Sequence, residues 1–164
     1  MSDSVSHNNT SLSIDVIIKE GRDLIPKDFS MFSSNKEGTS DPYVNLSLDG
    51  THYGTTRVEK NTLKPRWNYQ VPIITLDTEK ANHIFSDDSS TGGVLKFEVF
   101  DSDIIKDDPM GVVNVPLQSF LTKPKDPSLV RGEWYKIETG ESHHKSYCED
   151  ASGELLLKIK ITTT

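Results

Sequence analysis

The sequence predicts an all-β fold, an eight-stranded antiparallel β-sandwich. Short segments of alternating apolar and polar residues recur between clusters of turn residues, and helical periodicity is scarce after residue 11. Eight such segments suit two stacked antiparallel sheets. The 164 residues are enough for one domain with a proper core and too few for two. We therefore expect a polar leader over residues 1–11 and a single domain over residues 12–164.

Each predicted strand has its own local signal. The dipeptide Asp49-Gly50 is typical of a hairpin turn between two strands. Pro72 predicts an edge strand or a bulge, because proline has no N–H to donate to a neighbouring strand. In the last segment Leu155, Leu157 and Ile159 face one way. The predicted strands are 12–18, 43–48, 51–58, 67–74, 94–100, 111–117, 133–137 and 153–161, with one helical turn over 79–85.

Composition excludes several classes of function. The formal charge is −7, from 25 acidic and 18 basic residues, which disfavours nucleic-acid binding. The single cysteine, Cys148, cannot close an internal disulfide and favours a cytoplasmic, reducing compartment. No apolar run approaches the roughly 20 residues that span a bilayer, so membrane contact is expected to be peripheral. We find no nucleophile elbow and no phosphate-binding loop, and we predict no enzyme activity. His143, His144 and Cys148 lack a fourth zinc ligand.

Aspartates concentrate in two long loops, over residues 22–41 and 101–110. Asp101 and Asp103 flank Ser102 where a predicted strand gives way to the second loop, so both carboxylates can turn toward one ion. Ca²⁺ takes six to eight oxygen ligands, whereas Mg²⁺ prefers a stricter octahedron with more water. Without a cation, clustered carboxylates repel one another. The pattern predicts a Ca²⁺ site whose occupation stabilises the fold.

Three stretches in order resemble a C2 domain, the Ca²⁺-dependent phospholipid-binding module of protein kinase C and the synaptotagmins. They are Gly38–Val44, which reads GTSDPYV, Lys60–Asn68 and Phe97–Gly111, and the resemblance covers roughly residues 12–161. It implies five aspartates that ligate two or three Ca²⁺ ions. Carried over, the metal ligands are Asp28, Asp41, Asp101, Asp103 and Asp108, assisted by the backbone carbonyls of Lys27 and Ser102. A final strand after Trp134, with none before Leu12, resembles the type II permutation of the family.

Two departures from the family pattern leave ligands open. The family has five residues between its first two aspartates, whereas Asp28 and Asp41 are separated by twelve. Either an insertion follows Asp28, or Asn35 occupies that ligand position; a carboxylate is the better Ca²⁺ ligand. The loop after Asp103 is one residue short, which makes Asp107 a rival to Asp108.

The loop tips carry apolar residues where polar ones are usual. Either they fold back under the loops, or they insert between lipid headgroups while Ca²⁺ bridges protein and phosphate. The candidates for insertion are Phe29, Met31, Phe32, Ile104 and Ile105. A basic run offers possible phosphoinositide contacts, although a solvated face is the simpler interpretation. Its residues are Arg57, Lys60, Lys64 and Arg66.

Together these features predict a module that binds anionic phospholipid, phosphatidylserine or a phosphoinositide, when Ca²⁺ rises. We expect a cytoplasmic chain that is recruited to membranes in signalling or trafficking. The alternative is a Ca²⁺-independent protein-interaction module on the same fold, since an exposed edge strand could pair with a protein partner.

Overall fold

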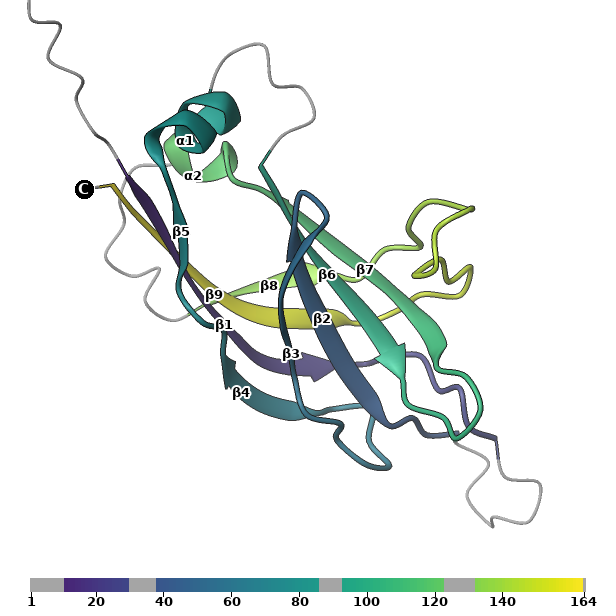
Figure 1. Ribbon diagram of the computed structural model, residues 1–164. Coiled ribbons are helices and arrows are strands. Elements are labelled where there is room, and N and C mark those ends of the chain that lie inside the picture. Colours follow the sequence, from purple (N-terminus) through teal and green to yellow (C-terminus); the bar gives the residue numbers. More distant parts are fainter. Residues whose placement is uncertain (1–10, 30–37, 86–92, 123–131, 164) are drawn as a thin grey trace, which may run out of the picture.

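The computed structural model describes residues 11–29, 38–85, 93–122 and 132–163, so residues 1–10 of the predicted leader lie outside the described part. Within these ranges the chain forms two packed β-sheets with two short helices at one end (Figure 1). The elements are β1 (Leu12–Arg22), β2 (Pro42–Leu48), β3 (Thr51–Thr55), β4 (Arg66–Gln70), β5 (Ile74–Leu76), α1 (Thr78–Phe85), β6 (Val94–Asp101), β7 (Asp108–Pro116), α2 (Ser119–Thr122), β8 (Glu133–Lys136) and β9 (Glu154–Thr163).

All strand pairs are antiparallel, which confirms the predicted all-β sandwich. One sheet has the order β4-β1-β9-β8, with β5 also paired to β1, and the other has the order β3-β2-β6-β7. The first and last strands are central neighbours, paired from Leu12↔Thr163 to Arg22↔Glu154. Segments that are far apart in the sequence therefore pair at the centre of one sheet.

The core lies between the sheets and follows the period-two alternation of the strands. In β1, Ile14 and Ile18 are fully buried, and in β6 so are Leu95 and Phe97. Burying one such side chain contributes about 1.5–3 kcal/mol. Trp67 of β4 fills the end of the core, where its indole Nε1 donates a hydrogen bond to the carbonyl oxygen of Pro42 at 3.2 Å.

The predicted strand over 67–74 is two strands, β4 and β5, separated by residues 71–73. Pro72 interrupts the pairing and resets the alternation of side chains. Strict alternation from Trp67 would place Ile73 on the inward face, but Ile73 is 66% exposed and Ile74 is buried in its place. The predicted single helical turn is longer, since α1 has eight residues. Asp77 accepts a hydrogen bond from the Lys80 N–H at 2.9 Å, as an N-cap residue does.

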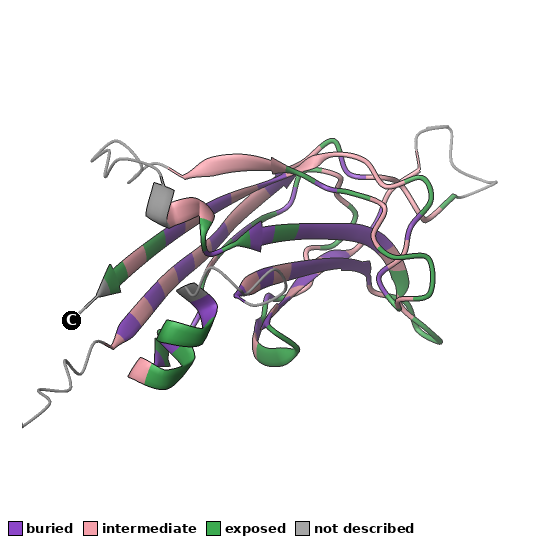
Figure 2. Ribbon diagram, turned by 90° about the horizontal axis from the view of Figure 1, so that it is seen from above, coloured by how far each residue is buried: buried purple, intermediate pink, exposed green. Residues whose placement is uncertain are grey.

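Strand β6 is buried on both faces near its end, as the continuous buried colour of the strand shows (Figure 2). The loop between β8 and β9 lies against the neighbouring β7, where Val112 exchanges backbone hydrogen bonds with Glu138 at 2.9 and 2.8 Å. Gly111 makes this approach possible, because an added Cβ would lie 2.6 Å from Ile137 Cγ2 and 2.7 Å from the Glu138 carbonyl oxygen. Its φ of +119° is also one that other residues rarely adopt.

Candidate metal and membrane-binding site

Three loops meet at the end of the sandwich opposite the two helices (Figure 1). They precede β2, join β3 to β4, and join β6 to β7. The strand register brings the aspartates to this end, since Asp101 is paired with both Pro42 and Asp108. The Ser102 N–H also donates to the Asp41 carbonyl oxygen at 3.0 Å, which ties the loop after β6 to the start of β2.

The first loop closes at its base, so Asp28 and Asp41 approach each other despite the twelve residues between them. Asp28 and Thr39 exchange two backbone hydrogen bonds, of 2.8 and 2.9 Å. Gly38 packs against this pair, because an added Cβ would lie only 2.7 Å from the Asp28 carbonyl oxygen. Asn35, the rival to Asp28, lies outside the described residues, as does most of the inserted segment.

Asp101 is the most deeply buried of the predicted ligands, with no solvent exposure. Its Oδ1 accepts a hydrogen bond from the Asp41 N–H at 2.5 Å, whereas its buried Oδ2 has no hydrogen-bond partner among the described residues. Burial raises the pKa of Asp101 to about 6. The charges of Asp28 and Asp103 add to this rise, whereas the Asp41 N–H and the Ser40 hydroxyl oppose it. An unsatisfied buried carboxylate oxygen is costly, and a cation would satisfy it.

The remaining predicted ligands lie within electrostatic reach of Asp28. Burial raises the pKa of the Asp28 carboxyl, and Asp103, Asp41 and Asp108 raise it further against the opposing effect of Lys60. Such effects on the pKa of Asp28 are expected when several carboxylates lie close together.

Asp41 differs from the other aspartates because it has a positive partner. Burial alone would raise its pKa, but the Asn61 N–H at 2.7 Å and the Lys60 ammonium at 2.9 Å outweigh burial and hold the pKa below its ordinary value. The hydrogen bond to Asp41 in turn raises the pKa of Lys60. Sequence reasoning did not identify this ion pair. Asn61, whose N–H reaches Asp41, has a left-handed backbone with φ of 51°.

The donor set suits Ca²⁺ in its chemistry, since it consists of carboxylate oxygens around one unsatisfied oxygen. Within the described ranges, however, no three carboxylate, imidazole or thiolate groups are arranged to hold a metal ion as they stand. Without a cation the carboxylates repel one another, so Ca²⁺ binding would require the aspartates to move closer together. The ligand assignments stay predictions.

Asp107 and Asp108 have different surroundings. Asp107 Oδ2 accepts a hydrogen bond from the Tyr43 hydroxyl at 2.5 Å, and its Oδ1 accepts one from the Asp103 N–H at 3.0 Å. Both oxygens of Asp107 are thus engaged within the protein. Asp108 is exposed and acts on Asp28 through its charge. This geometry favours Asp108 as the ligand.

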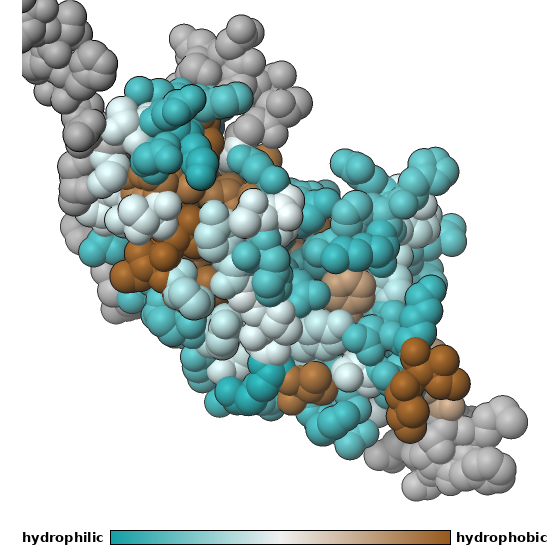
Figure 3. All heavy atoms as spheres, in the orientation of Figure 1, coloured by the Kyte–Doolittle hydropathy of each residue, from teal (hydrophilic) through white to brown (hydrophobic). Residues whose placement is uncertain are grey.

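An apolar patch, brown at the lower right of Figure 3, lies at the loop end of the molecule. Ile104 and Ile105 are essentially fully exposed, at 105% and 97%, and Phe29 is 71% exposed. These three side chains do not fold back under the loops. The other two candidates for insertion, Met31 and Phe32, lie outside the described residues.

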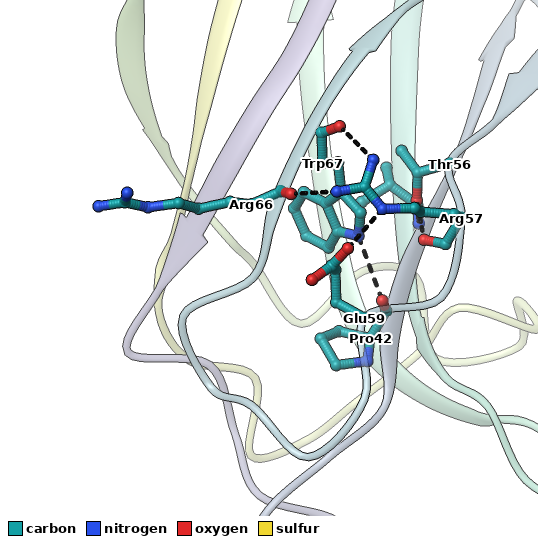
Figure 4. Close-up of polar contacts among 7 residues, drawn as sticks. Pro42, Thr56, Arg57, Glu59, Arg66 and Trp67 are labelled. Atoms are coloured by element: carbon teal, nitrogen blue, oxygen red, sulfur yellow. Dashed lines mark hydrogen bonds and ion pairs between the residues drawn. The ribbon is translucent and has the colours of Figure 1, made fainter.

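The basic run does not form one continuous face. The Arg57 guanidinium crosses to β4, where it donates to the carbonyl oxygens of Trp67 at 2.9 Å and Arg66 at 2.8 Å, and it also pairs with Glu59 at 2.5 Å (Figure 4). Arg66 lies 3.5 Å from Glu20 but is mostly exposed. Arg57 therefore braces the loop between β3 and β4, whereas Lys60, Lys64 and Arg66 are exposed. Contact of this basic run with phosphoinositides stays a prediction.

His144 and Cys148 have surroundings of their own, away from the aspartates. His144 Nδ1 lies 2.8 Å from Ser146 Oγ and 3.3 Å from Glu98 Oε1, and Cys148 is buried. In the described part of the chain, no helix is long and apolar enough to cross a membrane.

The raised pKa of Asp101 predicts how stability depends on pH without Ca²⁺. Its ionised form destabilises the fold above about pH 6, and the penalty disappears as the pH falls toward the ordinary value of 3.8. A pKa raised from 3.8 to about 6 corresponds to about 3 kcal/mol. We expect chelated protein to melt higher at about pH 5 than at about pH 7.5, and the substitution Asp101→Asn to reduce that difference. Equal pH dependence in the two proteins would contradict the burial of this charge.

Comparison with known proteins agrees with this architecture. The C2 domain family model matches residues 12–137. Extended synaptotagmin-1 of Mus musculus is 33% identical over 133 residues, which are 81% of this chain and 10% of that protein. FT-interacting protein 4 of Arabidopsis thaliana is 31% identical over 122 residues, 74% of this chain and 13% of that protein.

Among solved structures, a calcium-bound pair of C2 domains from extended synaptotagmin 2 superposes with a TM-score of 0.64 at 23% identity, over 91% of this chain and 45% of that one. That likeness shows the fold alone. The chain spans about a tenth of the length of the curated relatives it matches. The family match extends over most of the sandwich, and the chain belongs to the C2 domain family.

Proposed function

We propose that this chain binds anionic phospholipid membranes in a Ca²⁺-dependent manner. The observation that carries the proposal is the buried Oδ2 of Asp101, which has no hydrogen-bond partner in the described part of the chain and lies in an aspartate cluster whose loop also carries two fully exposed isoleucines. A cation supplies the missing charge, and a membrane supplies the missing apolar environment. The proposed site holds two Ca²⁺ ions, or three, through Asp28, Asp41, Asp101, Asp103, Asp108 and the carbonyls of Lys27 and Ser102.

Local charge, rather than net charge, drives the proposed attachment. Two Ca²⁺ ions add four positive charges to the formal −7 and leave the chain acidic at −3. Screening at physiological salt limits electrostatic range to about 8–10 Å, so the change at the loops decides the interaction. Ca²⁺ removes the repulsion between the aspartates and lipid phosphate. It also competes for Asp41, which frees the Lys60 ammonium, now 2.9 Å from that carboxylate, for an anionic headgroup.

The proposed setting is the cytoplasmic surface of a membrane, reached when Ca²⁺ rises, where the chain acts as a peripheral targeting module in signalling or trafficking rather than as an enzyme. Phosphatidylserine or a phosphoinositide is the proposed lipid. Membership of the C2 domain family supports this proposal. We also propose the type II strand order, which is supported by the position of the last strand, β9, between β1 and β8.

Thermal melting in chelator, in Ca²⁺ and in Mg²⁺ tests the metal site. Ca²⁺ at about 100 times its dissociation constant stabilises a protein by about 2.7 kcal/mol. For a chain of this size that corresponds to a rise of about 5–10 °C in melting temperature. We expect the rise in Ca²⁺ and a much smaller one in Mg²⁺.

Co-sedimentation with vesicles tests the membrane step. We expect pelleting with phosphatidylserine vesicles in Ca²⁺, and none in chelator or with vesicles of phosphatidylcholine alone. Sites completed by lipid phosphate would show a Ca²⁺ shift only when a soluble anionic headgroup is present. No shift under either condition, with equal vesicle binding in chelator and in Ca²⁺, would contradict the proposal and favour a Ca²⁺-independent interaction module.

A further inference from the structure

Tyr43, the residue after Asp41-Pro42, links the body of the domain to the loop between β6 and β7. Its ring stacks on Phe100 of β6, with ring centroids 5.7 Å apart and an interplanar angle of 26°. Phe100 is 7% exposed, so the stacked pair is firmly supported by the sheet. From this platform the Tyr43 hydroxyl donates a 2.5 Å hydrogen bond to Asp107 Oδ2.

Asp107 connects Tyr43 to the tip of the loop between β6 and β7. Its second oxygen, Oδ1, accepts the Asp103 N–H at 3.0 Å. One carboxylate therefore joins the sheet platform to the backbone of a residue that carries a predicted Ca²⁺ ligand. The fully exposed Ile104 and Ile105 lie between the two joined residues. The Asp107 carboxylate therefore fixes both ends of the loop segment that carries Asp103 and the two isoleucines.

We propose that Tyr43 and Asp107 are positioning residues that hold Asp103 and the loop tip ready for Ca²⁺, and that Asp107 is not itself a ligand. This inference rests on the function proposed above. A preorganised ligand lowers the cost of ordering the loop on binding. Residues that orient metal ligands typically change metal affinity by about 10–100-fold when they are replaced.

Tyr43→Phe is the cleanest test, because it removes the hydroxyl and changes no charge. We expect Ca²⁺ affinity, measured by calorimetry without lipid, to fall about tenfold. Amide exchange at Asp103, followed by NMR in chelator, is expected to accelerate, because its acceptor Asp107 loses its anchor. The matched control is Tyr135→Phe, which removes a hydroxyl that donates to the Glu133 carboxylate at 3.3 Å on β8.

A second pair of variants separates positioning from ligation. Asp107→Asn keeps an oxygen that can accept the Asp103 N–H and is expected to weaken Ca²⁺ binding moderately. Asp108→Asn removes a proposed ligand and is expected to weaken it far more. Equal behaviour of Tyr43→Phe and Tyr135→Phe in both affinity and exchange would overturn the inference, as would an Asp107→Asn variant as impaired as Asp108→Asn.

The exchange measurement also separates this inference from the proposed function. If the wild-type chain binds no Ca²⁺, the proposed function fails. Faster exchange at Asp103 in Tyr43→Phe would still support the positioning role of Tyr43 and Asp107. If the chain binds Ca²⁺ and exchange at Asp103 is unchanged in Tyr43→Phe, the positioning role is overturned while the proposed function stands. The melting temperature in chelator verifies that each variant is folded. If Tyr43→Phe does not fold, Asp107→Ala, which removes the acceptor of the Asp103 N–H, provides the exchange readout.

Discussion

Replacing Asp101 and Asp103 together with asparagine is expected to abolish Ca²⁺-dependent vesicle binding and to leave the domain folded. The two substitutions remove two negative charges from the centre of the cluster, where Asp101 has no solvent exposure. Asparagine keeps an oxygen that can accept the Asp41 N–H now bound at 2.5 Å, so the strand end retains its contact. Relief of carboxylate repulsion offsets part of the cost of the buried amide. Co-sedimentation in Ca²⁺, together with melting in chelator, measures both expectations.

The control for this experiment has the same change in charge elsewhere. Asp15 on β1 accepts a hydrogen bond from Gln70 at 2.6 Å, which asparagine can also accept, and Asp150 is exposed in the loop between β8 and β9. Asp15→Asn combined with Asp150→Asn should bind vesicles like the wild type. Ca²⁺-dependent binding by a folded Asp101→Asn, Asp103→Asn variant would show that the metal lies elsewhere.

Replacing Ile104 and Ile105 with serine is expected to weaken vesicle binding by about 100-fold or more while Ca²⁺ binding in solution persists. Burial of each isoleucine contributes about 1.5–3 kcal/mol, and each 1.4 kcal/mol is a tenfold change in affinity. Both side chains are almost completely exposed in the free protein, so they have little packing to lose. The rise of melting temperature in Ca²⁺ should therefore stay close to that of the wild type. The vesicle binding that remains should be more sensitive to salt, because it depends on charge alone.

Ile73 provides the matched control for this variant. It is also an exposed isoleucine, at 66%, but it lies between β4 and β5 rather than in the loops. Ile73→Ser should leave vesicle binding unchanged. A loss as large as that of the loop variant would indicate a general effect of surface hydrophobicity, and an unaffected loop variant would remove the apolar tip from the mechanism.

Local patterns determined much of the fold from the sequence alone. Alternation of apolar residues depends only on near neighbours, and it identified the strands, the inward residues of β1 and β6, and the two-sheet architecture. The alternation failed around Pro72, where loss of one N–H shifts the register. Ile74, rather than Ile73, is therefore buried in the core. The GTSDPYV stretch and the later Asp-Ser-Asp motif pointed to the same loops that the structure brings together at one end.

Only the tertiary structure decided which groups in these loops meet. The backbone pairing of Asp28 with Thr39 brings Asp28 near Asp41, whereas its rival Asn35 lies outside the described residues and the choice between them stays a prediction. The ion pair of Lys60 with Asp41, and the contact of Tyr43 with Asp107, join residues that are 19 and 64 positions apart. Such contacts depend on how the loops close over the sheet ends, which no short-range periodicity records. The sequence therefore determined which residues have the chemistry to bind a cation, and the fold determined which of their oxygens lack a partner among the described residues.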